Sequence, residues 1–381
     1  MFQQKKDWET RENAFAAFTM GPLTDFWHQR EEAEFRGVDD VPVRFVRFCA
    51  KENDRVVVIC PGRIESYVKY AELAYDLVHM GFDVLIIDHR GQGLSGRMLQ
   101  DTHRGHVDRF SDYVDDFAAF WQQDVQPGPW RKRYILAHSM GGAISTLFLQ
   151  RYAHQCDAIA LTAPMYGIVI RFPDWMVRHL LDWAEGHQRI REGYAIGTGR
   201  WRALPFAINV LTHSRQRYRR NLRFYADEPR LRVGGPTYHW VREGILAGEQ
   251  VLTGVGNDDT PTLLIQAEEE RVVDNRMHDR FCELRTAAGH PVVRADPRPA
   301  GHRLEPRLAG TVGLDPRHLP RAPRSWRPSR HLPVPGHRQS GYPAAGPRCR
   351  GRSWLPRWPR HARPGPPGLR AAPRAPWPCA G

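Results

Sequence analysis

The sequence has 381 residues, with 55 Lys and Arg against 42 Asp and Glu, and a formal net charge of +13. The positive excess lies in residues 294–381, which hold 18 Arg and 3 acidic residues, whereas the first 293 residues hold 37 basic against 39 acidic. Nucleic-acid binding requires a basic face on the folded domain, so this distribution argues against a nucleic-acid partner. The nearly neutral body is long enough for one large domain, with or without an insertion.

Targeting signals and metal motifs are not apparent. The first residues form no apolar segment of the signal-peptide kind, and no run approaches the roughly 18 apolar residues of a spanning helix. Six scattered cysteines show neither a CxxC pair nor zinc-type spacing, which favours free thiols in a reducing compartment. We therefore expect a protein on the cytoplasmic side of the membrane, without a metal or an organic cofactor.

Strands and helices alternate along the first part of the chain. Apolar and β-branched runs predict strands over 43–50, 55–60, 82–88, 134–137 and 158–162. Apolar residues at helical spacing predict helices over 67–80, 112–123 and 141–152. Repeated strand–helix units of this kind predict an α/β fold, a mostly parallel sheet with helices on both faces.

The alternation is interrupted after the fifth strand. Residues 164–256 are rich in aromatic residues and arginine, and we interpret them as an inserted lid. The pattern resumes with a strand over 261–267 and a helix over 275–288. The sequence thus predicts four segments, which are a first core part (1–163), the lid (164–256), a second core part (257–293) and a tail (294–381). One more strand and helix should complete the fold, but no pattern for them is visible.

The tail differs sharply in composition. Arg, Pro, Gly and Ala supply 58 of its 88 residues, and Lys, Ile, Phe, Asn and Met are absent. Nineteen prolines predict an irregular segment. A natural proline-rich tail is one explanation. Translation of GC-rich DNA out of frame is the other, and we favour it because the change falls inside an unfinished sheet.

The sharpest motif surrounds Ser139. In Tyr134–Gly142 a predicted strand runs into the serine, and small residues lead out into a predicted helix. This is the pattern of a nucleophile elbow, in which small neighbours allow a tight strand-to-helix turn. Ala137 stands where the first glycine is usual. The alternative, a plain helix N-cap, is less favoured because of the strand before and the glycines after.

Two loops accompany the elbow. The first follows the strand over 55–60, where Pro61-Gly62 fits either an ordinary turn or an oxyanion loop. In the second interpretation, the Arg63 and Met140 N–H groups are the candidate oxyanion donors. The second loop, Asp88–Ser95, is glycine-rich but matches no phosphate-binding motif, so we expect it to support the site structurally.

Together, these motifs resemble the monoacylglycerol-lipase-like branch of the α/β-hydrolases, and within it the lysophospholipases of enteric bacteria. The resemblance covers residues 1–292. PGRIESY is similar to the family's H-G-x-x-E-x loop, DHRGQGLS to its D-x-R-G-x-G-x-S loop, and AHSMGG to its G-H-S-M-G-G elbow. Cys60-Pro61 stands in place of the family's histidine in the oxyanion loop.

The acid and the histidine of a triad should follow the serine in the chain. Gln266–Asp274 offers four carboxylates, of which Glu268 and Glu269 read as solvated charges. Glu270 aligns best with the acid that the resemblance implies, and Asp274 is the alternative. The family's histidine context, G-x-x-H-E, is absent. His302 lies at about the implied distance but in the altered tail.

The lid contains five arginines within Arg215–Arg223. They form either a solvated helix face or a site for lipid phosphate, with Arg219 and Arg220 as candidates and peripheral membrane contact as a consequence. The resemblance implies a serine esterase acting on lysophospholipids or monoacylglycerols, with Ser139, Glu270 and His302 as the candidate triad. The alternative is an impaired lipid- or partner-binding homologue that lacks the histidine.

Overall fold

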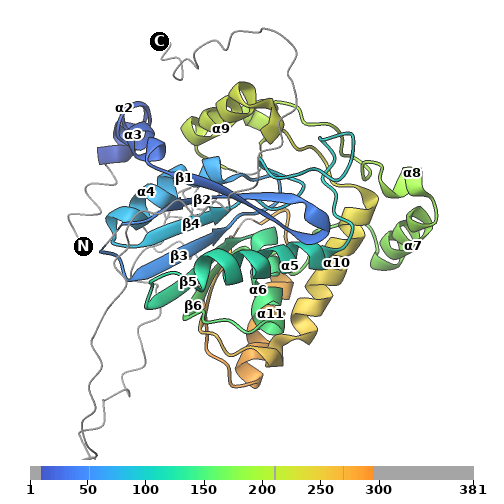
Figure 1. The fold of residues 1–381 in the computed structure, drawn as a ribbon. Helices are drawn as coiled ribbons and strands as arrows, with labels where there is room; N and C mark the ends of the chain where they lie inside the picture. The colour runs from blue at the N-terminus through green and yellow to red at the C-terminus, as the bar shows by residue number, and fades with distance from the viewer. Residues whose placement is uncertain (1–9, 51, 210–211, 269, 296–381) are drawn as a thin grey trace, which may run out of the picture. The chain divides into compact units, whose positions relative to one another are not determined.

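The described residues of the computed structural model are 10–50, 52–209, 212–268 and 270–295. They all belong to the first of two units into which the chain divides, residues 1–320 and 321–381. The described part contains one sheet of eight strands in the order β1-β2-β4-β3-β5-β6-β7-β8 (Figure 1). The strands are β1 Glu31–Arg36, β2 Pro42–Phe48, β3 Arg55–Cys60, β4 Asp83–Ile87, β5 Lys132–His138, β6 Ala158–Thr162, β7 Thr262–Ile265 and β8 Val292–Ala295.

The sheet is parallel from β4 to β8, and β1 and β2 pair antiparallel at one side. This confirms the predicted mostly parallel sheet. The prediction missed β1, whose residues EEAEFR are charged and lack the apolar pattern of a core strand. Cross-strand ion pairs such as Arg47–Glu31, at 2.7 Å between Nε and Oε2, accompany its pairing with β2.

Helices cover both faces of the sheet, as their order in the sequence predicts. They are α2 Phe15–Met20, α3 Pro22–His28, α4 Ala71–His79, α5 Phe110–Phe120, α6 Met140–Arg151, α7 Asp174–Glu185, α8 Gln188–Arg191, α9 Arg215–Asp227, α10 Tyr238–Thr253 and α11 Asn275–Ala287. Short turns of other helical types complete them at 67–70 before α4 and at 121–125 after α5. The predicted helix over 67–80 therefore corresponds to the turn at 67–70 with α4, and the one over 112–123 to α5 with the start of the turn at 121–125.

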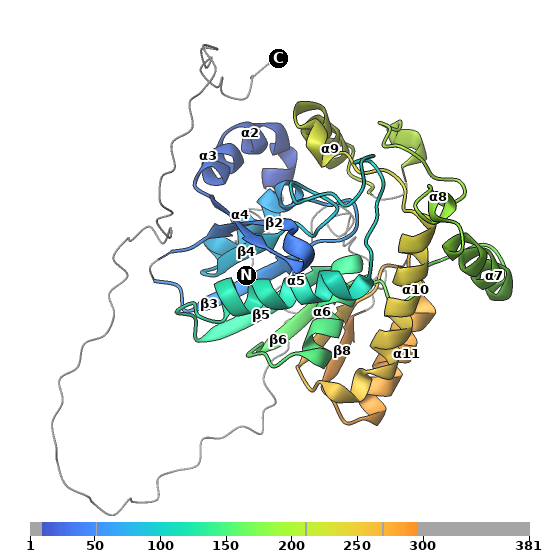
Figure 2. The ribbon, with the colours of Figure 1, turned by 45° about the vertical axis from the view of Figure 1, so that its right-hand side comes forward.

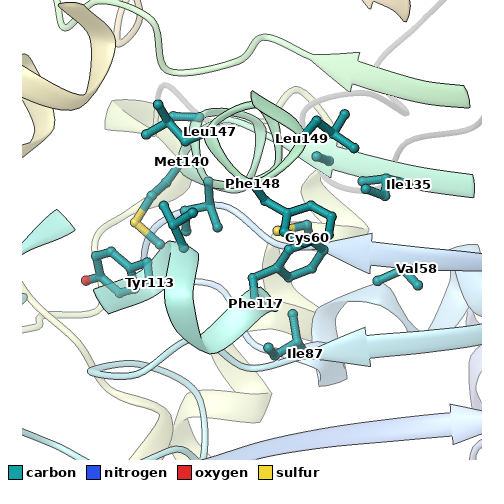
Figure 3. Close-up of a cluster of buried hydrophobic side chains, with 14 of the residues drawn as sticks. Val58, Cys60, Ile87, Tyr113, Phe117, Ile135, Met140, Leu147, Phe148 and Leu149 are labelled. Atoms are coloured by element: carbon teal, nitrogen blue, oxygen red, sulfur yellow. The ribbon is translucent and has the colours of Figure 1, made fainter. Parts of the chain in front are cut away.

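The hydrophobic core lies in two layers because side chains of a strand alternate between the faces of a sheet. In β3, Val56 and Val58 enter the cluster beneath α5, α6, α10 and α11, whereas Val57 and Ile59 enter the cluster beneath α3 and α4. Figure 3 shows the first layer, with Phe148 of α6 gathered among the neighbouring side chains. A strand buried on both faces reads as a continuous apolar run, and this is the pattern of β3 in the sequence.

The final strand corrects one expectation. The sequence shows no visible pattern for the strand expected after α11, yet Val292–Ala295 forms β8 and pairs in parallel with β7. The strand is only four residues long and runs across the start of the compositional change, so its pattern is too short to recognise. The helix that should follow it falls outside the described residues.

The region between β6 and β7 contains α7, α8, α9 and α10. Helix α10 returns to the core beside α5, α6 and α11, and α7 and α8 pack on α10 (Figure 2). Helix α9 lies near the N-terminal helices and α4. The proposed boundaries of the lid, 164 and 256, remain a prediction.

Candidate active site

Ser139 lies in the tight turn between β5 and α6. Its backbone has φ 49° and ψ −117°, a region that non-glycine residues rarely adopt. Two hydrogen bonds hold it there, from the Ser139 N–H to the Thr162 carbonyl at 3.1 Å and from the Met165 N–H to the Ser139 carbonyl at 2.9 Å. The strand-to-helix context predicted from the sequence is thus present, and the serine projects at the carboxyl edge of the sheet.

The glycines after the serine are required by close packing. A Cβ built on Gly141 would lie 2.1 Å from the carbonyl oxygen of Cys60. A Cβ built on Gly142 would lie 2.6 Å from the Cβ of Pro164. No real side chain tolerates such contacts, so these positions allow α6 to begin directly against the ends of β3 and β6.

The predicted oxyanion loop lies against the serine. A Cβ built on Gly62 would be 3.2 Å from the Ser139 Cβ, which places the following residue, Arg63, beside the elbow. Within the described residues, neither the Arg63 N–H nor the Met140 N–H donates a hydrogen bond. Two unengaged N–H groups from these two positions are what stabilisation of an oxyanion requires.

A glutamine and a glutamate brace this loop. The Gln92 side chain donates to the Gly62 carbonyl at 2.7 Å and accepts from the Ile64 N–H at 3.1 Å. The Glu65 carboxylate accepts the Gly62 N–H at 2.7 Å. These bonds hold Ile64 at a left-handed φ of 64°. Gln92 belongs to Asp88–Ser95, so this glycine-rich loop has the supporting role expected from the sequence.

Glu65 is a buried carboxylate held in its charged form. Burial by itself raises the pKa of Glu65, but the nearby Lys69 and His138 and hydrogen bonds from Lys69 and Tyr70 outweigh it and lower the pKa to about 2. A carboxylate that accepts several hydrogen bonds stays ionised in this way. The sequence resemblance pointed to the position of Glu65 but not to its contact with the oxyanion loop.

The two candidate acids differ in what they already bind. Glu270 Oε1 accepts the backbone N–H groups of its own turn, those of residues 271, 272 and 273, at 2.9, 2.8 and 3.2 Å. Asp274 is the N-cap of α11, accepting the Arg276 N–H at 3.0 Å and pairing with its guanidinium at 2.6 Å. The capping role occupies the Asp274 carboxylate, whereas Glu270 keeps its second oxygen without a hydrogen bond to any described residue.

The histidine of a triad is not among the contacts of Ser139. The candidate His302 lies outside the described residues, and within them the Ser139 hydroxyl has no hydrogen-bond partner. The sequence reasoning overlooked His278, which is buried and has Nε2 2.6 Å from the Pro164 carbonyl. Burial lowers the pKa of His278, although Glu270 acts in the opposite direction. No sequence signal marks His278, because it occupies an ordinary core position of α11.

Comparisons with known proteins identify the family. The sequence profile described as "Serine aminopeptidase, S33" matches residues 51–290. Lysophospholipase L2 of Escherichia coli strain K12 is 84% identical over 297 residues, covering 78% of this chain and 87% of that protein. A probable lysophospholipase L2 of Haemophilus influenzae is 30% identical over 295 residues, covering 74% of this chain and 92% of that protein. The chain belongs to the hydrolase family that this profile describes and that includes these lysophospholipases. It is an ester hydrolase.

Solved structures agree on the fold. A soluble variant of the Saccharomyces cerevisiae monoglyceride lipase is 12% identical, with a TM-score of 0.55, covering 74% of this chain and 89% of that one. A carboxyl esterase of Bacillus coagulans is 16% identical, with a TM-score of 0.55, covering 70% of this chain and 89% of that one. These likenesses identify the α/β-hydrolase fold and confirm the fold class predicted from the sequence.

The lid arginines of this hydrolase have roles that the sequence could not separate. Arg220 donates to Glu72 at 3.4 Å and to the Lys69 carbonyl at 3.3 Å, so part of its guanidinium already has protein partners, and its role in substrate binding remains a prediction. Arg217 is buried between Glu12 and Glu72. Arg219 is exposed on α9, and its role in substrate binding remains a prediction.

Proposed function

We propose that this chain cleaves the acyl ester of lysophospholipids or monoacylglycerols, with Ser139 as the nucleophile. The proposal depends above all on one arrangement, the strained Ser139 beside two N–H groups that have no partner among the described residues. The names of the relatives agree with it, because the protein that is 84% identical is a lysophospholipase. A serine in such an elbow is positioned for attack on an ester carbonyl.

In the proposed reaction, Ser139 Oγ attacks the carbonyl carbon while a histidine takes its proton. The Arg63 and Met140 N–H groups bind the resulting oxyanion, and the histidine returns the proton to the departing glycerol oxygen. Water then cleaves the acyl-enzyme by the same route and releases the fatty acid. Glu270 would orient the histidine, because its free carboxylate oxygen lies on a turn that its own backbone bonds hold in place.

The general base is the open part of this proposal. His302 is the candidate from the sequence, and it lies outside the described residues. His278 does not suit the role, because its ring is fully buried and Nε2 is bonded to the Pro164 carbonyl. The alternative function, a lipid-binding homologue without turnover, gains its support from the missing partner of the Ser139 hydroxyl within the described residues.

Contact with a lipid surface is the second element of the proposal. Large apolar side chains are exposed along α7 and just before it, including Phe172, Trp175 and Trp183. Aromatic residues on an amphipathic helix favour the boundary between water and lipid. No helix among the described residues is long and apolar enough to cross a membrane. We expect the full chain to sediment with anionic phospholipid vesicles, and Trp175→Ala with Trp183→Ala to weaken this binding.

Covalent labelling by a fluorophosphonate probe tests the nucleophile. The full chain should be labelled slowly, because its tail is expected to lack the general base, Ser139→Ala should not be labelled at all, and Ser111→Ala on α5 should be labelled like the unaltered chain. Circular dichroism checks that each variant is folded. If the folded, unaltered chain resists the probe while it binds lysophospholipid, the lipid-binding alternative is correct.

Comparison of Glu270→Gln with Asp274→Asn tests the acid. In the chain that carries the corresponding end of the E. coli relative, we expect Glu270→Gln to slow labelling and ester turnover, since the histidine loses its orienting carboxylate. Asp274→Asn should change labelling, turnover and stability little, because asparagine caps a helix about as well as aspartate and the pair with the exposed Arg276 contributes little. The opposite result would transfer the role of the acid to Asp274.

A further inference from the structure

Arg63 carries a half-buried guanidinium whose surroundings differ from those of the fully buried arginines. Its Nη2 donates to the Gly234 carbonyl at 2.8 Å, and its Cζ lies 4.9 Å from the centre of the Trp240 ring. A Cβ built on Gly105 would lie 2.4 Å from the same nitrogen. The guanidinium is therefore enclosed by a backbone oxygen, an aromatic face and a glycine.

No carboxylate among the described residues neutralises this charge. Within the described residues, no acidic oxygen forms a salt bridge with Arg63, and its Nε is buried without a hydrogen-bond partner. Burial lowers the pKa of Arg63 to about 10, so the group is still charged at neutral pH. A buried charge without a counterion is costly, and proteins rarely retain one without a use for it.

The fully buried arginines are paired with acids, whereas the half-buried Arg97 and Arg232 donate to backbone carbonyls, as Arg63 does. Arg90 pairs with Asp116 at 2.6 Å, Arg217 with Glu72 at 2.7 Å, and Arg285 with Asp258 at 3.3 Å. Each of these side chains is fully buried in contact with an acid, and Glu72 is shared with Arg11 and Arg220. Among the described residues Arg63 contacts no acid, and it remains partly accessible to solvent. An anion that arrives from solution could therefore reach it.

The position of Arg63 indicates which anion would arrive. It follows Gly62, where a built Cβ would lie 3.2 Å from the Ser139 Cβ, and its own N–H is a candidate donor to the ester oxyanion. In a lysophospholipid the glycerol unit separates the ester carbonyl from the phosphate by a chain comparable in length to an arginine side chain. One residue could thus meet the carbonyl with its backbone and the phosphate with its side chain.

We propose that the Arg63 guanidinium binds the phosphate of the substrate's head group, which makes Arg63 a residue that selects lysophospholipids over monoacylglycerols. This inference rests on the proposed function, because it assumes an ester held at Ser139. A guanidinium has five N–H donors in a planar fork that suits phosphate oxygens, and Gly234 accepts from only one nitrogen. The nearby Trp240 ring, whose Nε1 donates to the Tyr113 hydroxyl at 3.1 Å, supports the plane of the fork.

Binding to the full-length chain carrying Ser139→Ala tests the inference without hydrolysis. Calorimetry would compare lysophosphatidylethanolamine with the monoacylglycerol of the same acyl chain, below the concentration at which either forms micelles. With Arg63→Met added, we expect affinity for the phospholipid to fall by roughly tenfold or more, and that for the monoacylglycerol to change by less than about twofold. The affinity of Arg63→Lys for the phospholipid should lie between those of the parent chain and Arg63→Met, because lysine keeps the charge but lacks the planar fork of donors.

Two controls define the source of the anion and the role of the side chain. Arg215→Met, an exposed arginine on α9, should leave both affinities unchanged. Glycerophosphoethanolamine should compete with the lysophospholipid in the chain that keeps Arg63, and not in Arg63→Met. If free fatty acid competes in place of this head group, the site binds the product carboxylate and the phosphate assignment is wrong.

The remaining outcomes separate this inference from the proposed function. If Arg63→Met lowers the affinity for both lipids equally, or for neither, the selective role of Arg63 is wrong, while the proposed function stands. If the chain that keeps Arg63 binds neither lipid, the proposed function itself fails. Unfolding midpoints of Arg63→Met and Arg63→Lys within a few degrees of the parent would show that the comparison is made between folded proteins.

Discussion

Backbone strain in this molecule is concentrated at the site. Five described non-glycine residues have positive φ, and three of them, Ile64, Ser139 and Ala163, follow the carboxyl ends of β3, β5 and β6. Each costs of the order of 1 to 3 kcal/mol and persists only where the surroundings impose it. Here the surroundings are the Gln92 amide and the hydrogen bonds around Ser139. The fold thus holds unfavourable backbone conformations where three neighbouring loops converge.

Gly141→Ala should disrupt this convergence. The new Cβ would meet the carbonyl oxygens of Cys60 and Pro61, both of which are backbone atoms that cannot rotate away. We expect a loss of roughly 2 to 4 kcal/mol in the free energy of unfolding and a displaced oxyanion loop. Gly256→Ala is the matched control, because a Cβ there has nothing within 4 Å. Equal urea midpoints for the two variants would contradict the packing argument.

Glu65→Gln should lower stability in a way that depends on pH. The folded-state pKa of about 2 lies below the ordinary value of 4.5, so the charged carboxylate stabilises the fold above pH 4.5. That contribution is lost as the pH falls from 4.5 toward 2. At pH 7 the variant should lose roughly 3 kcal/mol, because Lys69 also loses its partner.

Urea unfolding of Glu65→Gln and of the unaltered chain at pH 7 and pH 4 measures this difference. We expect the gap in unfolding free energy to narrow at the lower pH. Glu268→Gln, at an exposed position, serves as the control and should show no gap at either pH. A gap for Glu65→Gln that stays constant between the two values would refute the assigned charge.

Among single residues, sequence reasoning identified those whose neighbours lie nearby in the chain. Ser139 was recognisable because the strand, the small residues and the helix that define its turn are contiguous. Arg217 and Arg220 looked alike in the sequence, since their acidic partner Glu72 is separated from them by 145 and 148 positions. Only the folded chain decides which arginine meets a carboxylate.

At the level of elements, ion pairs tie α9 to the body of the protein. Arg217 donates to Glu12 at 2.7 and 2.8 Å and to Glu72 of α4 at 2.7 and 3.1 Å. Farther along α9, the Tyr225 hydroxyl donates to the carbonyl of Ile64 in the oxyanion loop at 3.2 Å. The attachment of α9 therefore reaches the site through direct contacts.

Arg217→Met should loosen α9. Removing the guanidinium leaves Glu12 and Glu72 without their shared partner, while Glu72 keeps Arg11 and Arg220, so we expect a loss of about 1 to 3 kcal/mol. We expect faster proteolysis at α9 and a lower unfolding midpoint. Arg215→Met, exposed on the same helix, should behave like the unaltered chain. Identical cleavage patterns for the two variants would exclude an anchoring role for Arg217.

Element boundaries were predictable where the local pattern is strong. The predicted strand over 55–60 coincides with β3, because its apolar run is bounded by polar residues. β8 escaped prediction because four residues give no periodicity, and its pairing with β7 depends on a strand thirty positions earlier in the chain. Similarly, β1 forms because it pairs with β2, and its charged sequence alone does not predict this pairing.

For the whole molecule, the remaining question is how the triad is completed. The match to the E. coli relative covers 87% of that protein and leaves the rest of its length unaligned. The compositional change after residue 293 favours an altered end. A triad acts as a unit, so loss of its base costs nearly as much rate as loss of its serine.

We therefore expect weak ester hydrolysis by the 381-residue chain and little effect of His302→Ala. Replacing residues 296–381 by the corresponding end of the E. coli relative should raise turnover of lysophosphatidylethanolamine by roughly a thousandfold or more. The same replacement in the Ser139→Ala background is the control and should stay inactive. Robust turnover by the chain as printed, abolished by His302→Ala, would show that the present tail supplies the base.

The sequence by itself determined the alternation of strands and helices, the elbow at Ser139 and the loops beside it, because each of these depends on neighbours along the chain. Tertiary structure decided the bracing of Gly62 by Glu65 and Gln92, the burial of Arg217 and the unpaired charge of Arg63. These features arise where parallel strands end at one edge of a sheet and bring distant loops together. Local sequence patterns cannot predict such tertiary contacts, because a charged side chain is paired or unpaired according to which distant residues the fold brings next to it.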